Sequence, residues 1–233
     1  MKQDYILLIE TSTEACSVAL SKGSDLVTEK YTEVPKSHAS VIGTFIQDIF
    51  NETGMTAADL SAVAVSKGPG SYTGLRVGVS CAKGLCYGAQ IPLIGVNTLE
   101  VIARCAIDNN LAADTSYIVP MIDARRMEVY TATFTPDCTM VNTTKALVLA
   151  PDSFREELKN SKVLFTGNGA EKYKEEIPQE LRGNALFAPQ MPHASGLRLR
   201  AAEMLQKKEF EDCAYFEPFY LKDFVAGKPK KLL

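Results

Sequence analysis

The sequence predicts an α/β fold made of two related halves. Short apolar runs flanked by turn residues, as at residues 5–9 and 62–65, are typical of buried strands. Helical patterns alternate with these runs, and the apolar residues 41, 42, 45, 46, 49 and 50 fall on one helix face. A strand, a polar turn and a second strand occur at residues 5–20 and again at residues 117–134, which indicates a duplication.

The elements are expected in a regular order. In the first half we expect strands at residues 5–9, 16–20 and 26–31, a helix that begins at residues 35–37 and ends at Gly54, a strand at 62–65, a long helix to residue 89, a strand at 91–96, and a helix at 99–107 capped by Thr98. In the second half we expect strands at 117–122, 127–134 and 145–149, a helix at 151–159, strands at 163–165 and 185–187, and a helix at 194–206. The second half thus repeats the first with shorter helices.

The size of the chain allows two domains. With 233 residues, 46% hydrophobic and 23% charged, it can form one large core or two domains of about 100 residues each. The polar stretch at residues 108–116 marks the expected boundary. We expect a first domain at residues 1–108, to which the C-terminal segment 217–233 can be joined, and a smaller second domain at residues 109–216.

The overall composition excludes several classes. A net charge of −3 gives no overall indication of nucleic-acid binding, although a local basic patch stays open. The six cysteines form no CxxC or other metal spacing, which favours reduced thiols in the cytoplasm. No signal-peptide pattern occurs, and no apolar run approaches the roughly 20 residues of a membrane span. We therefore expect a cytoplasmic protein with no membrane partner.

Residues 61–89 are the most informative stretch. An apolar strand leads into a Gly-rich loop, Lys67-Gly68-Pro69-Gly70, and Ser71 stands where a helix N-cap belongs. Free backbone N–H groups and the helix dipole at such a junction can hold an anion. The glycines can equally serve only to let the chain turn and pack, so both interpretations stay open.

Small residues recur along the helix that follows this loop. Gly74, Gly78 and Ala82 form one row, and Gly84 and Gly88 form a second. Each glycine inside a helix costs about 1 kcal/mol relative to alanine, so we expect close packing to recover that energy. The packing partner can be a helix of the same chain or of another subunit. A polar row lies elsewhere on this helix and consists of Arg76, Ser80 and Lys83.

The sequence offers no recognisable catalytic set. Its two histidines, His38 and His193, lie far apart, and no HExxH or HxxxH spacing occurs, so no metal site is predicted. The sequence contains no GxSxG elbow, no Walker A motif and no cysteine with an evident histidine partner. Residues for metal or nucleophilic catalysis are therefore not apparent.

Polar turns in a duplicated α/β chain also fit a nucleotide cleft, because folds of the actin, hexokinase and Hsp70 (ASKHA) type wrap such turns around ATP phosphates. The candidates are Glu10, Thr11 and Ser12 in the first turn, Asp123 and Arg125 in the equivalent turn, and Gly167 and Gly169 in a later one. The first turn lacks the glycine that close phosphate approach requires, and its own hydroxyls can cap it instead. Arg125 and Arg126 can bind phosphate, but surface ion pairs with Asp123 and Glu128 are favoured.

Four segments of the sequence resemble a known family. They are residues 9–13 (IETST), 66–78 (SKGPGSYTGLRVG), 122–130 (IDARRMEVY) and 218–221 (PFYL). Together they resemble the TsaB (YeaZ) family over nearly the whole chain. The resemblance implies an ASKHA fold of two related domains and a role in making threonylcarbamoyladenosine (t6A) in tRNA. In that pathway TsaD, a paralogue of TsaB, transfers the threonylcarbamoyl group, and the ATPase TsaE joins the complex.

The chain departs from the pattern of TsaD at its metal site. TsaD holds its metal through an HxxxH pair after the strand that follows the glycine helix, and Thr98 and Ile102 stand at those positions here. A threonine hydroxyl is a poor metal ligand and isoleucine is none. The resemblance therefore implies a non-catalytic subunit without a metal, which binds and activates TsaD.

From the resemblance we expect TsaD to dock on the helices at residues 37–50 and 72–89. The expected interface residues are Gly68, Pro69, Gly70, Ser71, Tyr72, Thr73, Gly74, Leu75, Arg76, Gly78, Ala82, Ser37, His38 and Val41. Without TsaD the same face can form a homodimer. ATP or ADP is expected, if at all, only at the interface with TsaD, and tRNA only through the complex.

Two other functions stay open. The same fold can belong to an ATP-binding phosphotransferase or ATPase, which nucleotide binding with turnover would reveal. The chain can also be a tRNA-binding module, with the lysines between Lys222 and Lys231 as its contacts, although the negative net charge disfavours this.

Overall fold

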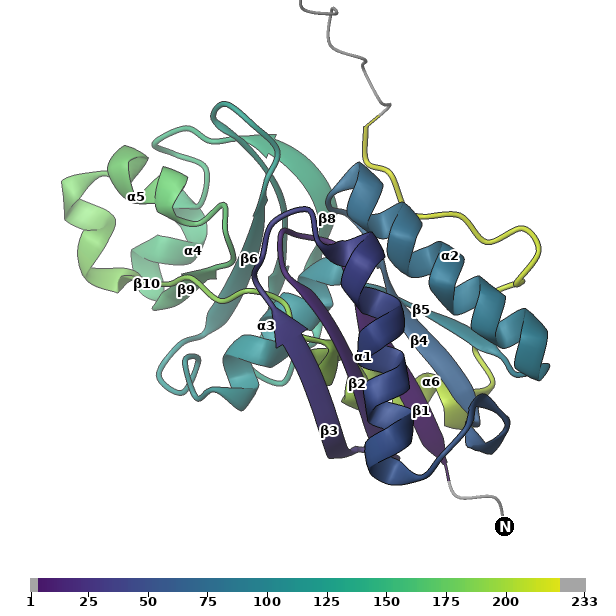
Figure 1. Cartoon of the computed structure of the whole chain (residues 1–233). Helices are drawn as coiled ribbons and strands as arrows, with labels where there is room; N and C mark the ends of the chain where they lie inside the picture. The colour runs from purple at the N-terminus through teal and green to yellow at the C-terminus, as the bar shows by residue number, and fades with distance from the viewer. Residues whose placement is uncertain (1–3, 223–233) are drawn as a thin grey trace, which may run out of the picture.

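The computed structural model describes residues 4–222 as two five-stranded mixed sheets (Figure 1). The first sheet has the strand order β3-β2-β1-β4-β5, and the second has the order β10-β9-β6-β7-β8. The strands of the first sheet are β1 (Tyr5–Glu10), β2 (Cys16–Lys22), β3 (Asp25–Thr32), β4 (Ala62–Gly68) and β5 (Leu93–Asn97). Those of the second are β6 (Tyr117–Asp123), β7 (Glu128–Phe134), β8 (Met140–Val148), β9 (Val163–Thr166) and β10 (Ala185–Ala188).

The two sheets repeat one topology. In the first sheet β1 pairs antiparallel with β2 and parallel with β4, and β4 pairs parallel with β5. In the second sheet β6 pairs antiparallel with β7 and parallel with β9, and β9 pairs parallel with β10. Each half is therefore an antiparallel meander extended by two parallel strands. This confirms the predicted α/β class and the predicted duplication.

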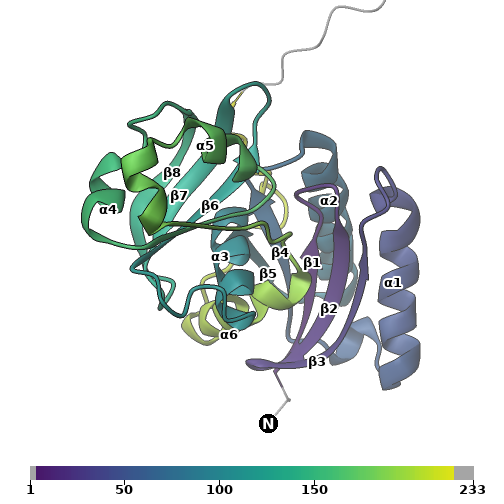
Figure 2. The same ribbon diagram turned by 90° about the vertical axis from the view of Figure 1, so that its left-hand side faces the viewer.

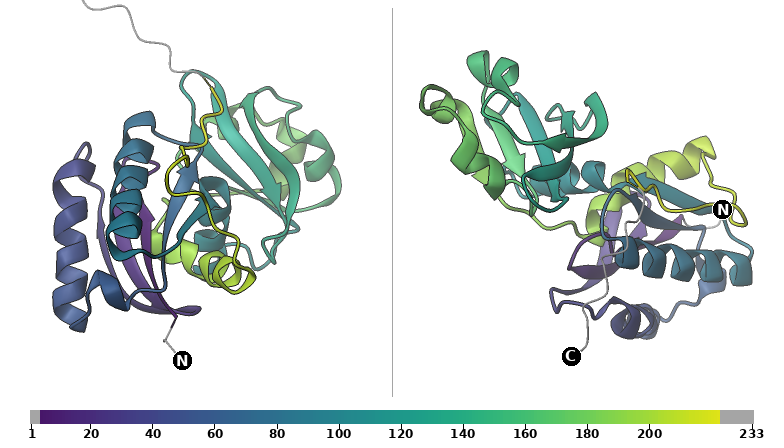
Figure 3. Two further views of the ribbon diagram at one scale, coloured as in Figure 1. Left: turned by 90° about the vertical axis from the view of Figure 1, so that its right-hand side faces the viewer. Right: turned by 90° about the horizontal axis from the view of Figure 1, so that it is seen from above.

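Helices cover both sheets. α1 (His38–Thr53) and α2 (Tyr72–Ala89) lie side by side on one face of the first sheet, and α3 (Thr98–Asp108) and α6 (Arg198–Lys207) lie on its other face (Figures 1 and 3). The short α4 (Arg155–Asn160) and α5 (Glu171–Glu176) cover the outer side of the second sheet (Figure 2). Three 3-10 segments complete the order: η1 (Ala57–Asp59), η2 (Gln179–Asn184) and η3 (Ala194–Leu197).

α3 lies between the two sheets and contacts the second one. Leu99 and Ile102 on this helix are fully buried and belong to one apolar cluster with Ile118 and Phe134 of the second sheet. Full burial of such a side chain stabilises a fold by about 1.5–3 kcal/mol. The helix that ends the first half therefore helps to hold the second sheet against the first.

The helical segments that end the second half return to the first sheet. Leu197 of η3 and Ala201 and Met204 of α6 pack in one cluster with Ile6 and Leu8 of β1. The packing thus assigns residues 194–207 to the core of the first sheet. The sequence-based domain limits differ from this packing, because they group the chain up to residue 216 with the second half.

Residues 209–222, here termed the C-terminal strap, run along the edge of the first sheet and over α2 (Figure 3). The Glu211 backbone N–H donates to the carbonyl of Leu93 in β5 at 2.9 Å, and the Phe219 N–H donates to the carbonyl of Lys67 at 2.6 Å. These contacts place the described part of the predicted segment 217–233 beside the first sheet. The remaining residues of that segment lie outside the described part of the chain.

Some element ends differ from the prediction. Asn97 is the N-cap of α3 in place of Thr98, because its side-chain oxygen accepts from the Leu99 N–H at 2.8 Å while Thr98 is buried. β8 begins at Met140 rather than residue 145, because as an edge strand it carries exposed polar residues without apolar alternation. α5 is not predicted by the pattern.

Within residues 4–222 no helix is long and apolar enough to cross a membrane.

Candidate partner interface

The Gly-rich loop before α2 packs against the β1–β2 turn. Ser71 is the N-cap of α2, as predicted, and its hydroxyl accepts from the Gly74 N–H at 3.2 Å. The Ser71 N–H itself donates to the carbonyl of Ser12 at 2.6 Å. A side chain at Gly70 would overlap that same carbonyl. Of the two interpretations, the structure supports glycines that let the chain turn and pack.

The predicted docking row on α2 faces inward. Gly74, Gly78 and Ala82 are all buried, and a methyl group at Gly74 or Gly78 would overlap Thr11. The Thr11 hydroxyl donates to the Gly74 carbonyl at 2.8 Å. The close packing that the glycines imply is therefore made by the chain's own β1–β2 turn. This corrects the expectation that Gly74, Gly78 and Ala82 meet a partner helix.

Several other expected interface residues are also inside the molecule. Gly68, Pro69 and Leu75 are buried, and so is His38, the first residue of α1. The His38 Nε2 lies 2.9 Å from the carbonyl oxygen of Thr13 and 3.1 Å from that of Ala15. His38 therefore holds the β1–β2 turn from the side of α1 and does not face a partner.

Glu10 ends β1 with a fully buried carboxylate. It accepts from the Ser12 N–H at 2.6 Å, from the Ser12 hydroxyl, and from the hydroxyl of Ser66 on β4. Burial raises the pKa of Glu10 above its ordinary value of 4.5, and the serine hydrogen bonds oppose this shift. The groups of Glu10, Thr11 and Ser12 are thus used within the first domain, and nucleotide binding at this turn stays a prediction.

The equivalent turn between β6 and β7 carries the second set of candidates. Asp123 pairs with Lys172 at 2.6 Å, and its N–H donates to the Asn168 side chain at 3.0 Å. Glu128 pairs with Lys222 of the C-terminal strap. The favoured surface ion pairs therefore exist, but lysines make them instead of Arg125 and Arg126, which is a correction.

The two late glycines support the backbone around this turn. A side chain at Gly167, whose φ is 89°, would overlap Met121, and one at Gly169 would press on residues 122, 123 and 129. Both glycines therefore allow the loop after β9 to lie directly against β6. A phosphate site at these glycines stays a prediction.

An outward face remains on α1 and α2, here termed the outer helical face. Its exposed residues on α2 and its cap are Ser71, Thr73, Arg76, Ser80, Gly84, Tyr87 and Gly88. Those on α1 are Ala39, Ser40, Gly43, Thr44 and Gln47. Half-buried apolar residues lie between the two sets: Val41, Phe45, Val77, Cys81 and Leu85.

The second small row, and not the first, lies on this face. An added side chain at Gly84, Gly88 or Gly43 of α1 would meet no atom of the chain within 4 Å. Tyr87, 77% exposed, stands beside them. Among the other expected interface residues, Ser71, Thr73 and Arg76 are exposed, and the half-buried ones are Gly70, Tyr72, Ser37 and Val41.

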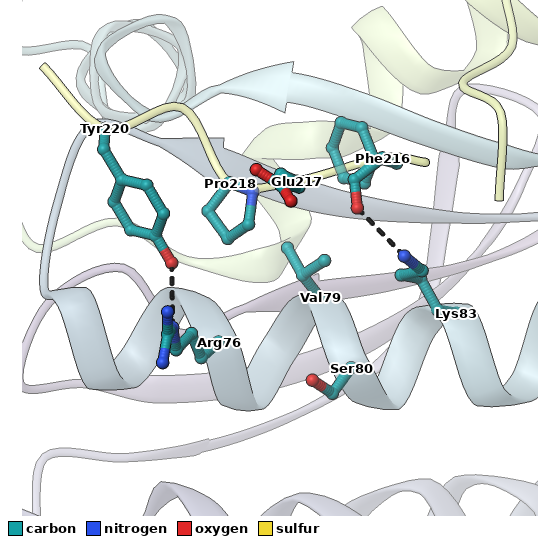
Figure 4. Close-up of a pocket in the computed structure, with 8 residues that line it drawn as sticks. All are labelled: Arg76, Val79, Ser80, Lys83, Phe216, Glu217, Pro218 and Tyr220. Atoms are coloured by element: carbon teal, nitrogen blue, oxygen red, sulfur yellow. Dashed lines mark hydrogen bonds between the residues drawn. The ribbon is translucent and has the colours of Figure 1, made fainter. Parts of the chain in front are cut away.

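The C-terminal strap forms one border of the outer helical face (Figure 4). The Arg76 Nε donates to the Tyr220 hydroxyl at 3.2 Å, and the guanidinium carbon lies 4.3 Å from the Tyr72 ring centre. Lys83 donates to the Phe216 carbonyl at 3.0 Å. A cavity of about 210 Å³ lies between α2 and the strap. The sequence gives no periodic signal for this strap, so its residues were not expected at the site.

Thr98 and Ile102, the positions at which the resemblance to TsaD implies metal ligands, are inside α3. Thr98 and Ile102 are both fully buried. Residues 4–222 contain no group of three or more His, Cys, Asp or Glu side chains that could hold a metal ion.

The duplicated sheets and their helices define a protein of the ASKHA class. The ethanolamine utilization protein EutJ from Carboxydothermus hydrogenoformans shares this fold with a TM-score of 0.51 and 12% identity, over 85% of this chain and 90% of that chain. The family model of TsaD, tRNA N6-adenosine threonylcarbamoyltransferase, matches residues 30–230.

Two other proteins are similar to nearly the whole chain. The chain is 33% identical over 231 residues to the tRNA threonylcarbamoyladenosine biosynthesis protein TsaB of Escherichia coli K12, covering 96% of each chain. It matches the structure of YeaZ from Pseudomonas aeruginosa with a TM-score of 0.79 and 27% identity, over 94% of this chain and 100% of that chain. The chain belongs to the TsaB (YeaZ) family.

The packing of α2 on the turn predicts a coupled mutant pair. Gly78→Ala places a methyl group against the Thr11 hydroxyl and is expected to lower the free energy of unfolding by about 1–3 kcal/mol. Thr11→Ala removes that hydroxyl, so the double variant is expected to lose less than the sum of the two single changes. Urea denaturation measures all three. Gly84→Ala is the control and is expected to gain up to about 1 kcal/mol. Additive losses would contradict this packing.

The buried carboxyl of Glu10 predicts a pH dependence. Its folded pKa is raised, so its contribution to stability is complete below pH 4.5 and declines as the pH rises through the folded value. Glu10→Gln removes the titration and keeps an oxygen for the Ser12 N–H. We expect the stability of the variant relative to the native chain to increase from pH 4.5 upward, measured by urea denaturation. Exposed Glu156→Gln serves as the control, and parallel curves for Glu10→Gln and the native chain would refute the assignment.

Proposed function

We propose that this chain is the non-catalytic subunit of the tRNA t6A complex, which binds and activates TsaD. The observation that carries the proposal is the full-length similarity to a protein named for t6A biosynthesis. The similarity of residues 30–230 to the TsaD model supports descent from a common ancestor, and Thr98 and Ile102 lack the ligand chemistry of its metal site.

The outer helical face is the proposed docking surface for TsaD. It offers a strip of small residues at Ser80, Gly84 and Gly88 beside half-buried apolar side chains, and this combination allows close helix packing. Glycines in a helix interior that contact nothing in their own chain are costly unless a partner packs there. In the absence of TsaD the same face is proposed to form a homodimer. A two-fold axis would place this face of one chain against the same face of a second copy.

The other components follow from this arrangement. TsaE is proposed to join the complex of the two paralogues, ATP or ADP to bind only at their interface, and tRNA to be modified on TsaD. The chain itself is proposed to supply no reacting group.

Blocking the small strip is expected to prevent docking without unfolding the chain. Gly84→Leu adds an exposed side chain at a helix position with free space around it, so the melting temperature should stay the same or rise. Co-elution with TsaD in size-exclusion chromatography is expected to be lost. Gly183→Leu, also exposed with free space but in the second half, should leave the complex intact. A Gly84→Leu chain that still co-elutes with TsaD would rule out this surface.

The proposed role predicts a requirement in reconstitution. TsaD, TsaE and the enzyme that makes threonylcarbamoyl-AMP are expected to form t6A on a tRNA transcript when this chain is present, and at least about tenfold less when it is omitted. Mass spectrometry of nucleosides measures the product. Equal t6A formation in both reactions would contradict the role, and turnover of ATP by the chain alone would favour the ATPase alternative.

A further inference from the structure

The turn between β6 and β7 presents two adjacent arginines. Asp123 and Val129 form the last pair of the two strands, and the residues between them close the hairpin. Arg125 and Arg126 are both exposed. Neither guanidinium has a hydrogen bond or ion pair with a residue in the range 4–222, whereas the two carboxylates beside them are paired.

The charges around this turn leave a positive excess. Lys172 pairs with Asp123, and Lys222 pairs with Glu128, so each carboxylate is matched by one lysine. The guanidiniums of Arg125 and Arg126 are additional to these pairs. The turn therefore carries two uncompensated positive charges in a chain whose net charge is −3.

The backbone of the turn is unusual for these residue types. Arg125 has a φ of 70° and Arg126 a φ of 50°, a region that favours glycine and asparagine. Two arginines therefore occupy positions where other residues would close the hairpin with less strain. Residues whose backbone conformation is unfavourable for their type, with no packing reason for it, are concentrated at functional sites.

Three N–H groups of the turn are used internally. Ala124 N–H donates to the Glu128 carbonyl at 3.0 Å, Arg125 N–H to the Asp123 carboxylate at 2.6 Å, and Glu128 N–H to the Arg125 carbonyl at 3.1 Å. A compact phosphate group needs several free N–H groups converging on it. Long cationic side chains at the surface suit the spaced phosphates of a polyanion instead.

The turn lies on the same side of the molecule as the start of α2. Lys222, which contacts Glu128 beside the turn, is two residues beyond Tyr220, which contacts Arg76 on α2. The C-terminal strap thus connects the turn to the border of the outer helical face. A nucleic acid bound to a partner on that face would be close to both arginines.

We propose that Arg125 and Arg126 contact backbone phosphates of the tRNA that is bound to the partner subunit. The proposal rests on the proposed function, since it requires a tRNA on the docked transferase. Guanidinium groups pair with phosphate oxygens through two parallel hydrogen bonds, and each phosphate contact releases condensed counterions. The contact is to phosphate and not to bases, so it adds affinity without sequence preference.

The test measures binding of a fluorescein-labelled, unmodified tRNA transcript to the complex of this chain with TsaD. Fluorescence anisotropy is recorded from about 50 to about 200 mM salt. The double variant Arg125→Gln, Arg126→Gln is expected to bind at least about tenfold more weakly at low salt. Its slope of log K against log salt should be smaller by about 1.4–1.8, the value for two phosphate contacts. A merely structural role for the arginines would not change that slope.

A matched control and a second variant keep the test decisive. Arg155→Gln with Lys159→Gln removes the same charge from α4, at a half-exposed and an exposed position, and should leave tRNA binding unchanged. Arg125→Gly with Arg126→Gly relieves the positive φ angles, so it should keep or raise the melting temperature and still lose tRNA affinity.

The outcomes separate this proposal from the proposed function. An unchanged slope, or an equal loss of tRNA affinity in the α4 control, would overturn the phosphate contact. A native complex that co-elutes but does not bind tRNA would also overturn it, and would leave the docking role standing. Failure of the native chain to co-elute with TsaD would instead overturn the proposed function.

Discussion

The contact between Thr11 and the glycines of α2 is the constraint on which the first domain depends. The β1–β2 turn fits against Gly74 and Gly78 so closely that a methyl group at either position would overlap Thr11. This contact brings α2 onto the sheet, and His38 holds the same turn from α1. Since both helices are fixed by one turn, the direction of the outer helical face follows from it.

The same turn shows how a polar β-hairpin can serve structure. Glu10 lies at the end of β1 with its carboxylate buried and hydrogen-bonded to Ser12 and Ser66. In an open cleft such groups would be free to meet a ligand, but here they satisfy one another. Burying the carboxylate raises its pKa, and the hydrogen bonds from Ser12 and Ser66 oppose that rise.

The C-terminal strap joins features that lie far apart in the sequence. Phe216 and Tyr220 of the strap form hydrogen bonds with Lys83 and Arg76 of α2. Lys222 of the strap pairs with Glu128, beside the two arginines of the second half. The outer helical face and the basic turn are thereby contacted by one segment of the chain. This arrangement underlies the two proposals, that the outer helical face binds TsaD and that the two arginines contact the tRNA.

Local periodicity and capping chemistry were enough to predict the order of strands and helices except α5, the duplication, and the N-cap at Ser71. The motifs also determined the family. Which row of α2 faces inward could not be predicted, since the rows containing Gly78 and Gly84 are equally small in the sequence and differ only in what the folded chain packs against them. Likewise, the pairing of Asp123 with Lys172, 49 residues away, depends on how the loop after β9 packs on β6, which no local pattern encodes.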